Sequence, residues 1–365
     1  MNQNKTVFPN FPLAELHSHL ATSINPAVYW QIAHAQGFKL PKKDFHEFID
    51  YVMLSERKKM TLNEYFDKIY HPLLDPLSSG TFAVDQAVYE IMSGAYRNNI
   101  TLIELRNNPM KHNREGELDL DHIIMASLRG MERALLEYRK LRAGIILCIG
   151  REFSVQKNEI IIEKAIKYHR RGIVGIDVAG PAAKSFKMKD YKDLFAKAKK
   201  AGLGTTVHTG EVNDSNDIWE SLEFVAPSRI GHGIKAAYDK KLMIELSKRN
   251  IVLEICPFSN LVTKAVENVE ELEFIIRTFL ENKVKFCINT DWPEVIEDAH
   301  LYRQFQFLLE KKIMTKEELE NSSKIAFEST FIPQADSMHI CNYFDPNKST
   351  KILIFQTVWG HRSHQ

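Results

Sequence analysis

Six titratable side chains end short apolar runs of this sequence, where a folded chain can gather groups for chemistry. They are His17, His19, His208, Glu211, His232 and Asp291. His17 and His19 lie two residues apart, so on a strand both side chains project to one face. Three imidazoles and one carboxylate at one place are suitable ligands for a divalent zinc ion. An HxH pair alone fits a structural role equally well, but the company of the other residues favours a metal site.

The runs that carry these residues alternate with amphipathic stretches along the chain. Eight runs predict strands, at residues 14–20, 99–106, 142–150, 173–180, 203–211, 229–234, 251–257 and 285–291. Continuous apolar runs are typical of parallel strands buried on both faces. Helix-like segments such as 190–201 and 269–283 lie between them. The pattern predicts an α/β fold, a (β/α)8 TIM barrel whose carboxyl-terminal face holds the six side chains, with a doubly wound sheet as the alternative.

Other polar residues at these ends have simpler interpretations. Arg106 and Arg151 end the second and third predicted strands, where a structural ion pair is the default. Ser259 and Asn260 face the site or cap a loop.

A long insertion separates the first two predicted strands. Residues 21–98 contain two or three helix-like stretches rich in aromatic and aliphatic residues, which either cover the barrel mouth as a lid or pack on the outer helices. Leu62, Phe66 and their helical neighbours are candidates for a pocket roof or for core packing. We predict a single domain over residues 1–365, with a C-terminal extension at 332–365.

The amino-acid composition limits the kinds of binding partner that we expect. Lysine and arginine number 48 against 47 acidic residues, so no global field attracts nucleic acid or a membrane surface. Four widely spaced cysteines, three of them in predicted strands, indicate reduced thiols and a cytoplasmic protein. We expect a small-molecule partner bound at a local site, while the oligomeric state is left open.

The strand-end motifs resemble those of a known family. PLAELHSHL, VGIDVAG, VHTGE, RIGHG, CPFSN and NTDWP, in this order, are similar to the motif series of the adenosine deaminase family, from about residue 10 to residue 331. That family is a zinc-containing barrel that hydrolyses the 6-amino group of adenine nucleosides.

The resemblance implies a role for each residue. One zinc ion per chain would be held by the side chains of His17, His19, His208 and Asp291. Glu211 would donate a proton to purine N1, His232 would orient the attacking water and help to take its proton, and Gly180 would bring its backbone amide close to purine N3. Zinc lowers the pKa of water to about 7, and burial could give Glu211 the raised pKa that an acid needs.

Two positions depart from the family pattern. An aspartate that holds the ribose 5′-hydroxyl is replaced by Ala21, followed by Thr22 and Ser23, so a 5′-phosphate is no longer repelled and two hydroxyls could bind it. Alternatively, Ala21 leaves the 5′-hydroxyl to water. The aspartate that bonds purine N7 is replaced by Trp292, whose indole N–H could donate to N7 or whose ring could fill space around another base.

These residues predict a hydrolytic deaminase of an adenine nucleoside or its 5′-monophosphate, releasing ammonia. One alternative is a deaminase of another amino-heterocycle, such as adenine or a modified purine nucleoside. Another is a nucleoside-binding family member without turnover, against which the complete set with Glu211 argues. A two-metal hydrolase of the same barrel class is disfavoured because the fourth predicted strand ends at Gly180 without a bridging lysine.

Overall fold

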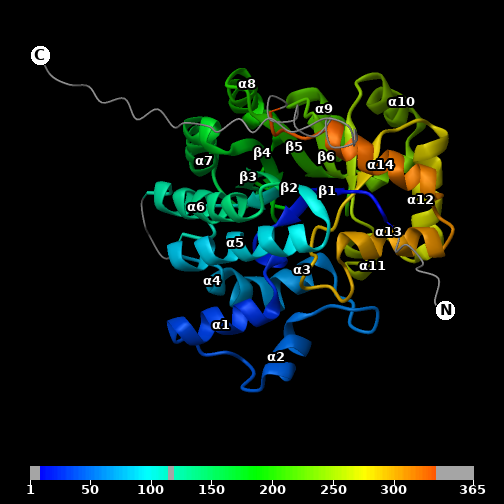
Figure 1. Cartoon of the computed structure of the whole chain (residues 1–365). Coiled ribbons are helices and arrows are strands. Elements are labelled where there is room, and N and C mark those ends of the chain that lie inside the picture. Colours follow the sequence, from blue (N-terminus) through cyan, green and yellow to red (C-terminus); the bar gives the residue numbers. More distant parts are fainter. Residues whose placement is uncertain (1–8, 114–118, 334–365) are drawn as a thin grey trace, which may run out of the picture. The chain divides into compact units, whose positions relative to one another are not determined.

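Eight parallel strands form one sheet in sequence order, from β1 to β8. The computed structural model describes residues 9–113 and 119–333. The strands are β1 (Leu13–His19), β2 (Ile100–Asn107), β3 (Arg142–Gly150), β4 (Ile173–Ala179), β5 (Gly204–Thr209), β6 (Arg229–His232), β7 (Val252–Ile255) and β8 (Phe286–Ile288). Helices surround the sheet (Figure 1), so the predicted barrel is confirmed and the doubly wound alternative is not.

The segment after β8 returns to β1 and nearly closes the barrel. The Asp291 amide donates to the His17 carbonyl at 2.7 Å, and the His19 amide donates to the Asp291 carbonyl at 3.3 Å. The Asn289 side chain accepts from the Leu16 amide at 2.9 Å. Closure therefore uses the residues that carry the candidate site, which ties the site's geometry to the barrel itself.

The helices that follow β2 and the later strands form the outer ring. They are α6 (Asp121–Glu137), α7 (Val155–Tyr168), η3 (His169–Arg171), η4 (Met188–Tyr191), α8 (Lys192–Lys200), α9 (Asn216–Phe224), η5 (Ile234–Tyr238), α10 (Lys240–Lys248), α11 (Pro257–Val262), α12 (Val269–Glu281), α13 (Leu301–Glu310) and α14 (Lys316–Glu328). No helix in the described part of the chain is both long enough and apolar enough to cross a lipid bilayer.

The insertion between β1 and β2 is helical, as predicted. It contains η1 (Ala21–Ser23), α1 (Pro26–Gln36), α2 (Phe45–Val52), α3 (Leu62–Tyr65), the π-helix η2 (Phe66–Leu74), α4 (Asp75–Leu77) and α5 (Thr81–Arg97). The Leu54 amide donates to the Val295 carbonyl at 2.7 Å, so the insertion is joined to the loop after β8. Helices α1 to α4 lie together at one side of the barrel (Figure 1).

The barrel interior is more polar than the continuous apolar runs suggested. Its inward positions include buried charged residues, whereas barrels of this class are filled mainly by branched apolar side chains. The buried charged residues of the strands are Glu15 of β1, Glu104 and Arg106 of β2, Asp177 of β4, Arg229 of β6 and Glu254 of β7. The described residues up to Ile332 form one compact unit. The predicted extension at 332–365 lies almost wholly outside the described residues and stays a prediction.

Candidate active site

A cavity of about 270 Å³ opens at the carboxyl ends of the strands. Its wall contains five of the six titratable residues that the sequence singled out: His19, His208, Glu211, His232 and Asp291. The sixth, His17, is fully buried and belongs to the same cluster of side chains. The strand-end positions of the sequence therefore converge in space as predicted.

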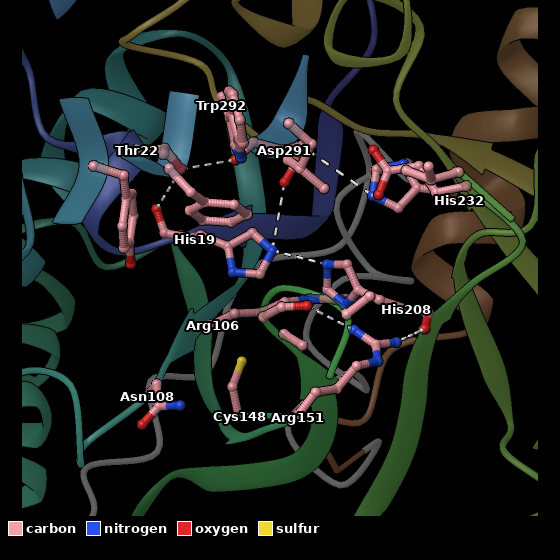
Figure 2. Close-up of a pocket in the computed structure, with 18 of the residues that line it drawn as sticks. His19, Thr22, Arg106, Asn108, Cys148, Arg151, His208, His232, Asp291 and Trp292 are labelled. Carbon is pink, nitrogen blue, oxygen red and sulfur yellow. Dashed lines mark hydrogen bonds and ion pairs between the residues drawn. The ribbon is translucent and has the colours of Figure 1, made fainter. Parts of the chain in front are cut away.

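Four of these side chains form a potential metal site. One ligand atom each from His17, His19, His208 and Asp291 lies within 4.8 Å of the others. Nε2 of His19 is 3.0 Å from Nε2 of His208, and both His17 and His19 place Nε2 within 3.5 Å of Asp291 Oδ1. Figure 2 shows the side chains of His19 of β1, His208 of β5 and Asp291, which follows β8, converging on one another.

The chemistry of these donors fits a divalent cation. Nε2 of His17 is buried without a hydrogen-bond partner, which is costly unless another group occupies the space. Burial lowers the pKa of both His17 and His19 well below the ordinary value, so the imidazoles stay neutral with a lone pair to donate. Three nitrogens and one oxygen match the ligand preference of zinc. The cluster could therefore hold a metal ion.

Carboxylates from two other strands fix two of the imidazoles. Glu254 Oε2 lies 2.8 Å from Nδ1 of His17, and Asp177 Oδ2 lies 2.9 Å from Nδ1 of His208. A carboxylate at Nδ1 favours the tautomer that carries the proton there, which leaves Nε2 free for a metal. Burial opposes ionisation of Asp177, but Arg106 and His208 hold the pKa of its carboxyl well below the usual range.

Helix α11, which follows β7, fixes two further groups. Ser259 donates to Asp291 Oδ2 at 2.7 Å, which leaves Oδ1 directed at the imidazoles. The side-chain nitrogen Nδ2 of Asn260 lies 3.0 Å from Nδ1 of His232. Asp291 and His232 both have positive φ, 61° and 62°, a backbone conformation that is costly for residues other than glycine and that clusters at functional sites. Of the two readings of Ser259 and Asn260, the structure supports contact with the site.

Glu211 and His232 lie next to each other beside the cluster. Glu211 lies in the loop after β5, and its Oε2 is 3.6 Å from Nε2 of His232. Burial raises the pKa of Glu211, an effect that His208 and Arg151 partly oppose. Burial lowers the pKa of His232 to about 4, so this imidazole is neutral near pH 7. A protonated carboxyl and a neutral imidazole can donate and accept protons respectively.

The predicted substrate-binding residues have mixed positions. Gly180, Ala21, Thr22 and Trp292 line the cavity, whereas Ser23 is buried and is not part of its wall. The Thr22 hydroxyl lies 3.3 Å from the carbonyls of both His19 and Asp291, to which it can donate its proton.

Gly180 and Trp292 are constrained by their neighbours. Gly180 has φ +92°, a backbone conformation that strongly favours glycine, and a Cβ there would also displace the Glu152 carboxyl, whose Oε2 would lie 2.5 Å away. The indole of Trp292 is buried and stacks on Tyr65, with ring centroids 4.7 Å apart and an interplanar angle of 31°. Phe66 of the insertion lies beside the same indole at 6.5 Å.

The sequence interpretation missed the residues that support this site. Asp177 and Glu254 were not singled out, although each is an isolated acid within an apolar run, which is a signal for a buried partner. Arg151 was interpreted as an ion pair, but its guanidinium donates to the Gly180 carbonyl at 2.9 Å and to the His208 carbonyl. Lys111 also lines the cavity, with Nζ 2.7 Å from Glu152.

The barrel is parallel and gathers three imidazoles and a carboxylate at its carboxyl-terminal face. This is the arrangement of a metal-dependent barrel enzyme. Comparison with known proteins is more specific. The family model described as Adenosine deaminase matches residues 12–346. An adenosine deaminase from Clostridium kluyveri is 30% identical over 336 residues, which cover 92% of this chain and 94% of the relative. The chain belongs to the adenosine deaminase family and, with it, to the hydrolases that act on C–N bonds.

Solved structures share the fold at lower identity. An adenine deaminase from Arthrobacter aurescens is 20% identical with a TM-score of 0.77, covering 91% of this chain and 97% of that one. An Arabidopsis N6-mAMP deaminase is 22% identical with a TM-score of 0.76, covering 92% and 97%. The same fold thus serves proteins named for a free base and for a nucleotide, so the substrate must be argued from local residues.

Proposed function

We propose that this protein uses one zinc ion to hydrolyse the 6-amino group of an adenine nucleoside or its 5′-monophosphate, releasing ammonia. The proposal rests on one observation above all: the Glu211 carboxyl, whose side chain is only 11% exposed, lies 3.6 Å from a neutral imidazole, His232, directly beside a potential metal site. Deamination of a purine needs an acid, a base and activated water at the same place.

The residues divide the reaction between them. His17, His19, His208 and Asp291 would hold the zinc ion, which when bound makes water acidic enough to serve as a nucleophile near neutral pH.

The protein's own groups then manage the protons. Glu211 donates a proton to purine N1 as water adds to C6, so negative charge does not build up on the ring. His232 accepts the proton that the water loses. His232 returns that proton to the amino group, which leaves as ammonia. The hydroxyl on C6 gives its remaining proton to Glu211 as C6 becomes a carbonyl. Water adds, ammonia leaves, and both side chains recover their starting protonation.

Local residues favour a nucleotide over a nucleoside, for a reason that differs from the sequence argument. The hydroxyl of Thr22 is within reach of backbone carbonyls and Ser23 lies outside the cavity wall, so these two are weak phosphate donors. Lys111 instead brings a cation to the wall, paired with Glu152, and no carboxylate occupies the position of Ala21. A phosphate on the substrate can share the charge of Lys111.

The deciding experiment is ammonia release by zinc-loaded protein from adenosine, deoxyadenosine, AMP, dAMP and adenine. We expect turnover of a nucleoside or nucleotide and a loss of kcat of about 10²- to 10⁴-fold in Glu211→Gln, since that is what general acid catalysis contributes. Zinc content should remain one per chain in this variant. No turnover on the whole panel, or two metal ions per chain, contradicts the proposal.

A second variant separates the substrates. Lys111→Met should lower kcat/KM for AMP and dAMP but leave adenosine unchanged if the lysine meets a phosphate. Equal effects on adenosine and AMP would mean that the 5′-phosphate does not contact Lys111. Preference for adenine or for an N6-substituted purine would support the alternative that Trp292 has adapted the pocket to another heterocycle.

A further inference from the structure

The two carboxylates that orient the metal-site imidazoles lie close to each other inside the barrel. Glu254 of β7 holds His17, and Asp177 of β4 holds His208. Both carboxylates are fully buried. Two buried negative charges require a nearby cation, because a buried charge without a partner is strongly destabilising.

One arginine, from a strand that carries no metal ligand, contacts both carboxylates. Arg106 of β2 donates through Nη1 to Asp177 Oδ2 at 2.9 Å and through Nη2 to Glu254 Oε2. Nη2 also donates to the Leu16 carbonyl at 3.2 Å, one residue before His17. The side chain is fully buried, and its contacts leave it little freedom to rotate.

The guanidinium matches this task by its shape. Its planar fork holds two oxygen acceptors at a fixed separation, whereas the lysine ammonium is a compact charge that cannot bridge them in the same way. Arg106 thus connects the partners of two ligands that come from different strands, β1 and β5. Its Nη1 lies 3.4 Å from Nδ1 of His208, so displacement of the guanidinium would disturb that imidazole directly.

We propose that Arg106 is a positioning residue for the metal: by holding Asp177 and Glu254 at once, it sets the directions of His17 and His208 and thereby the site's affinity for zinc. The proposal rests on the metal site of the proposed function. Removing Arg106 takes away the one group that bridges the two carboxylates, although Arg229 still holds Glu254 Oε1. Loss of such outer partners of metal ligands costs about 10- to 100-fold in metal affinity.

Arg229 offers a matched control within the same barrel. It is buried to the same degree and donates to Glu254 Oε1 at 2.7 Å, but its other acidic partner is Glu104, not Asp177. Removing Arg229 therefore deletes an equally buried arginine while the fork between the two carboxylates remains.

The test compares Arg106→Met, Arg106→Lys and Arg229→Met with the unaltered protein. Zinc affinity is measured by competition with a chromogenic chelator, and ligand geometry by the visible absorption spectrum after loading with Co²⁺. We expect 10- to 100-fold weaker zinc binding and an altered Co²⁺ spectrum in Arg106→Met, with partial recovery in Arg106→Lys. Arg229→Met should lower the unfolding midpoint of the metal-free protein but keep the Co²⁺ spectrum.

Wild-type affinity and spectrum in both Arg106 variants would overturn the proposal, as would an equal change in Arg229→Met. If Arg106→Met does not fold, Arg106→Lys decides, because it keeps the buried charge: an unchanged spectrum refutes the role of the fork. Wild-type protein that binds no zinc also overturns it. Zinc binding without deamination would refute the proposed function alone, since neither measurement depends on turnover.

Discussion

Trp292 joins the metal cluster to the helical insertion. It follows Asp291 directly, lines the cavity and stacks on Tyr65, the last residue of α3. Because Trp292 belongs to the cavity wall, its indole N–H is a candidate donor to a bound molecule. An indole donates only, which suits an acceptor such as purine N7.

Replacement of Trp292 by phenylalanine should therefore discriminate between substrates. We expect kcat/KM to fall about tenfold for adenine nucleosides or nucleotides, because a lost buried hydrogen bond costs ~1–3 kcal/mol. The 7-deaza analogues, which lack the acceptor, should be affected much less. Trp219→Phe is the control, since that indole donates to Asp239. Equal losses for both substrate classes would assign Trp292 a packing role only.

The residue types and their spacing in the sequence predicted the metal ligands better than they predicted the residues that contact those ligands. His17, His19, His208 and Asp291 end recognisable strands, so convergence at one face followed from the barrel. The partners of Trp292 could not be predicted in this way, because its stack depends on how a long insertion returns over the mouth. Nor does a lone acid such as Glu254 reveal from sequence which buried cation it meets.

At the scale of elements, the strands were predicted to within a few residues, but the insertion differs in detail. Residues 61–74, within the insertion predicted to be helical, form a short α3 followed by the π-helix η2. Pro72 lies within η2 and has no amide hydrogen for an α-helical ladder. A wider π turn places Phe66 and Tyr70 in the cavity wall, and π turns are frequent at functional sites. Lid motion of this element stays a prediction.

His112 ties the insertion to the loop after β2. It is buried in the cavity wall, and its Nδ1 lies 3.3 Å from the Ser78 hydroxyl, between α4 and α5. The His112 carbonyl also accepts from the Gly80 amide at 2.8 Å. Burial lowers the pKa of His112 from 6.5 to about 4, with Asp75 opposing and Lys111 reinforcing the shift.

This contact should make stability depend on pH. Between pH 6.5 and about 4 the unfolded chain binds a proton at His112 that the folded protein excludes, so stability falls as the pH falls through this range. From pH 7.5 to pH 5 the loss should be about 2 kcal/mol greater in the wild type than in His112→Gln. Urea unfolding at both pH values measures the difference, and the remaining histidines are common to both proteins. Parallel losses would show that His112 is protonated without cost in the folded state.

At the scale of the whole molecule, one polar network runs from the barrel floor to the metal cluster. Arg229 joins Glu254 to Glu104, and Glu104 accepts from the Thr330 hydroxyl at 2.6 Å. The ring of Phe331 lies 3.6 Å from the Arg229 guanidinium. The segment after α14 therefore fills the floor of the barrel. The charged residues Glu104, Arg229 and Glu254 connect this segment to the carboxylates that hold the imidazoles.

The ring of Phe331 can pack into the floor of the barrel because Gly175 and Gly204 have no side chains there. A Cβ on Gly204 of β5 would lie 2.0 Å from the Phe331 ring, and one on Gly175 would lie 2.8 Å from it. We predict that Gly204→Ala lowers the free energy of unfolding by about 1–3 kcal/mol, which is typical of overpacking. The same substitution should cost little in Phe331→Ala, because the ring that it meets is gone.

A double-mutant cycle measured by denaturant unfolding tests this, with coupling expected between Gly204 and Phe331 because the two residues touch. Gly94→Ala is the control: this glycine lies within α5, and an added Cβ would come no closer than 4.0 Å to the Arg97 side chain. Alanine should stabilise that helix slightly. If the effects of the two substitutions on the free energy of unfolding are additive, the added methyl group is accommodated without contact with Phe331. The segment after α14 then does not determine the stability of the barrel.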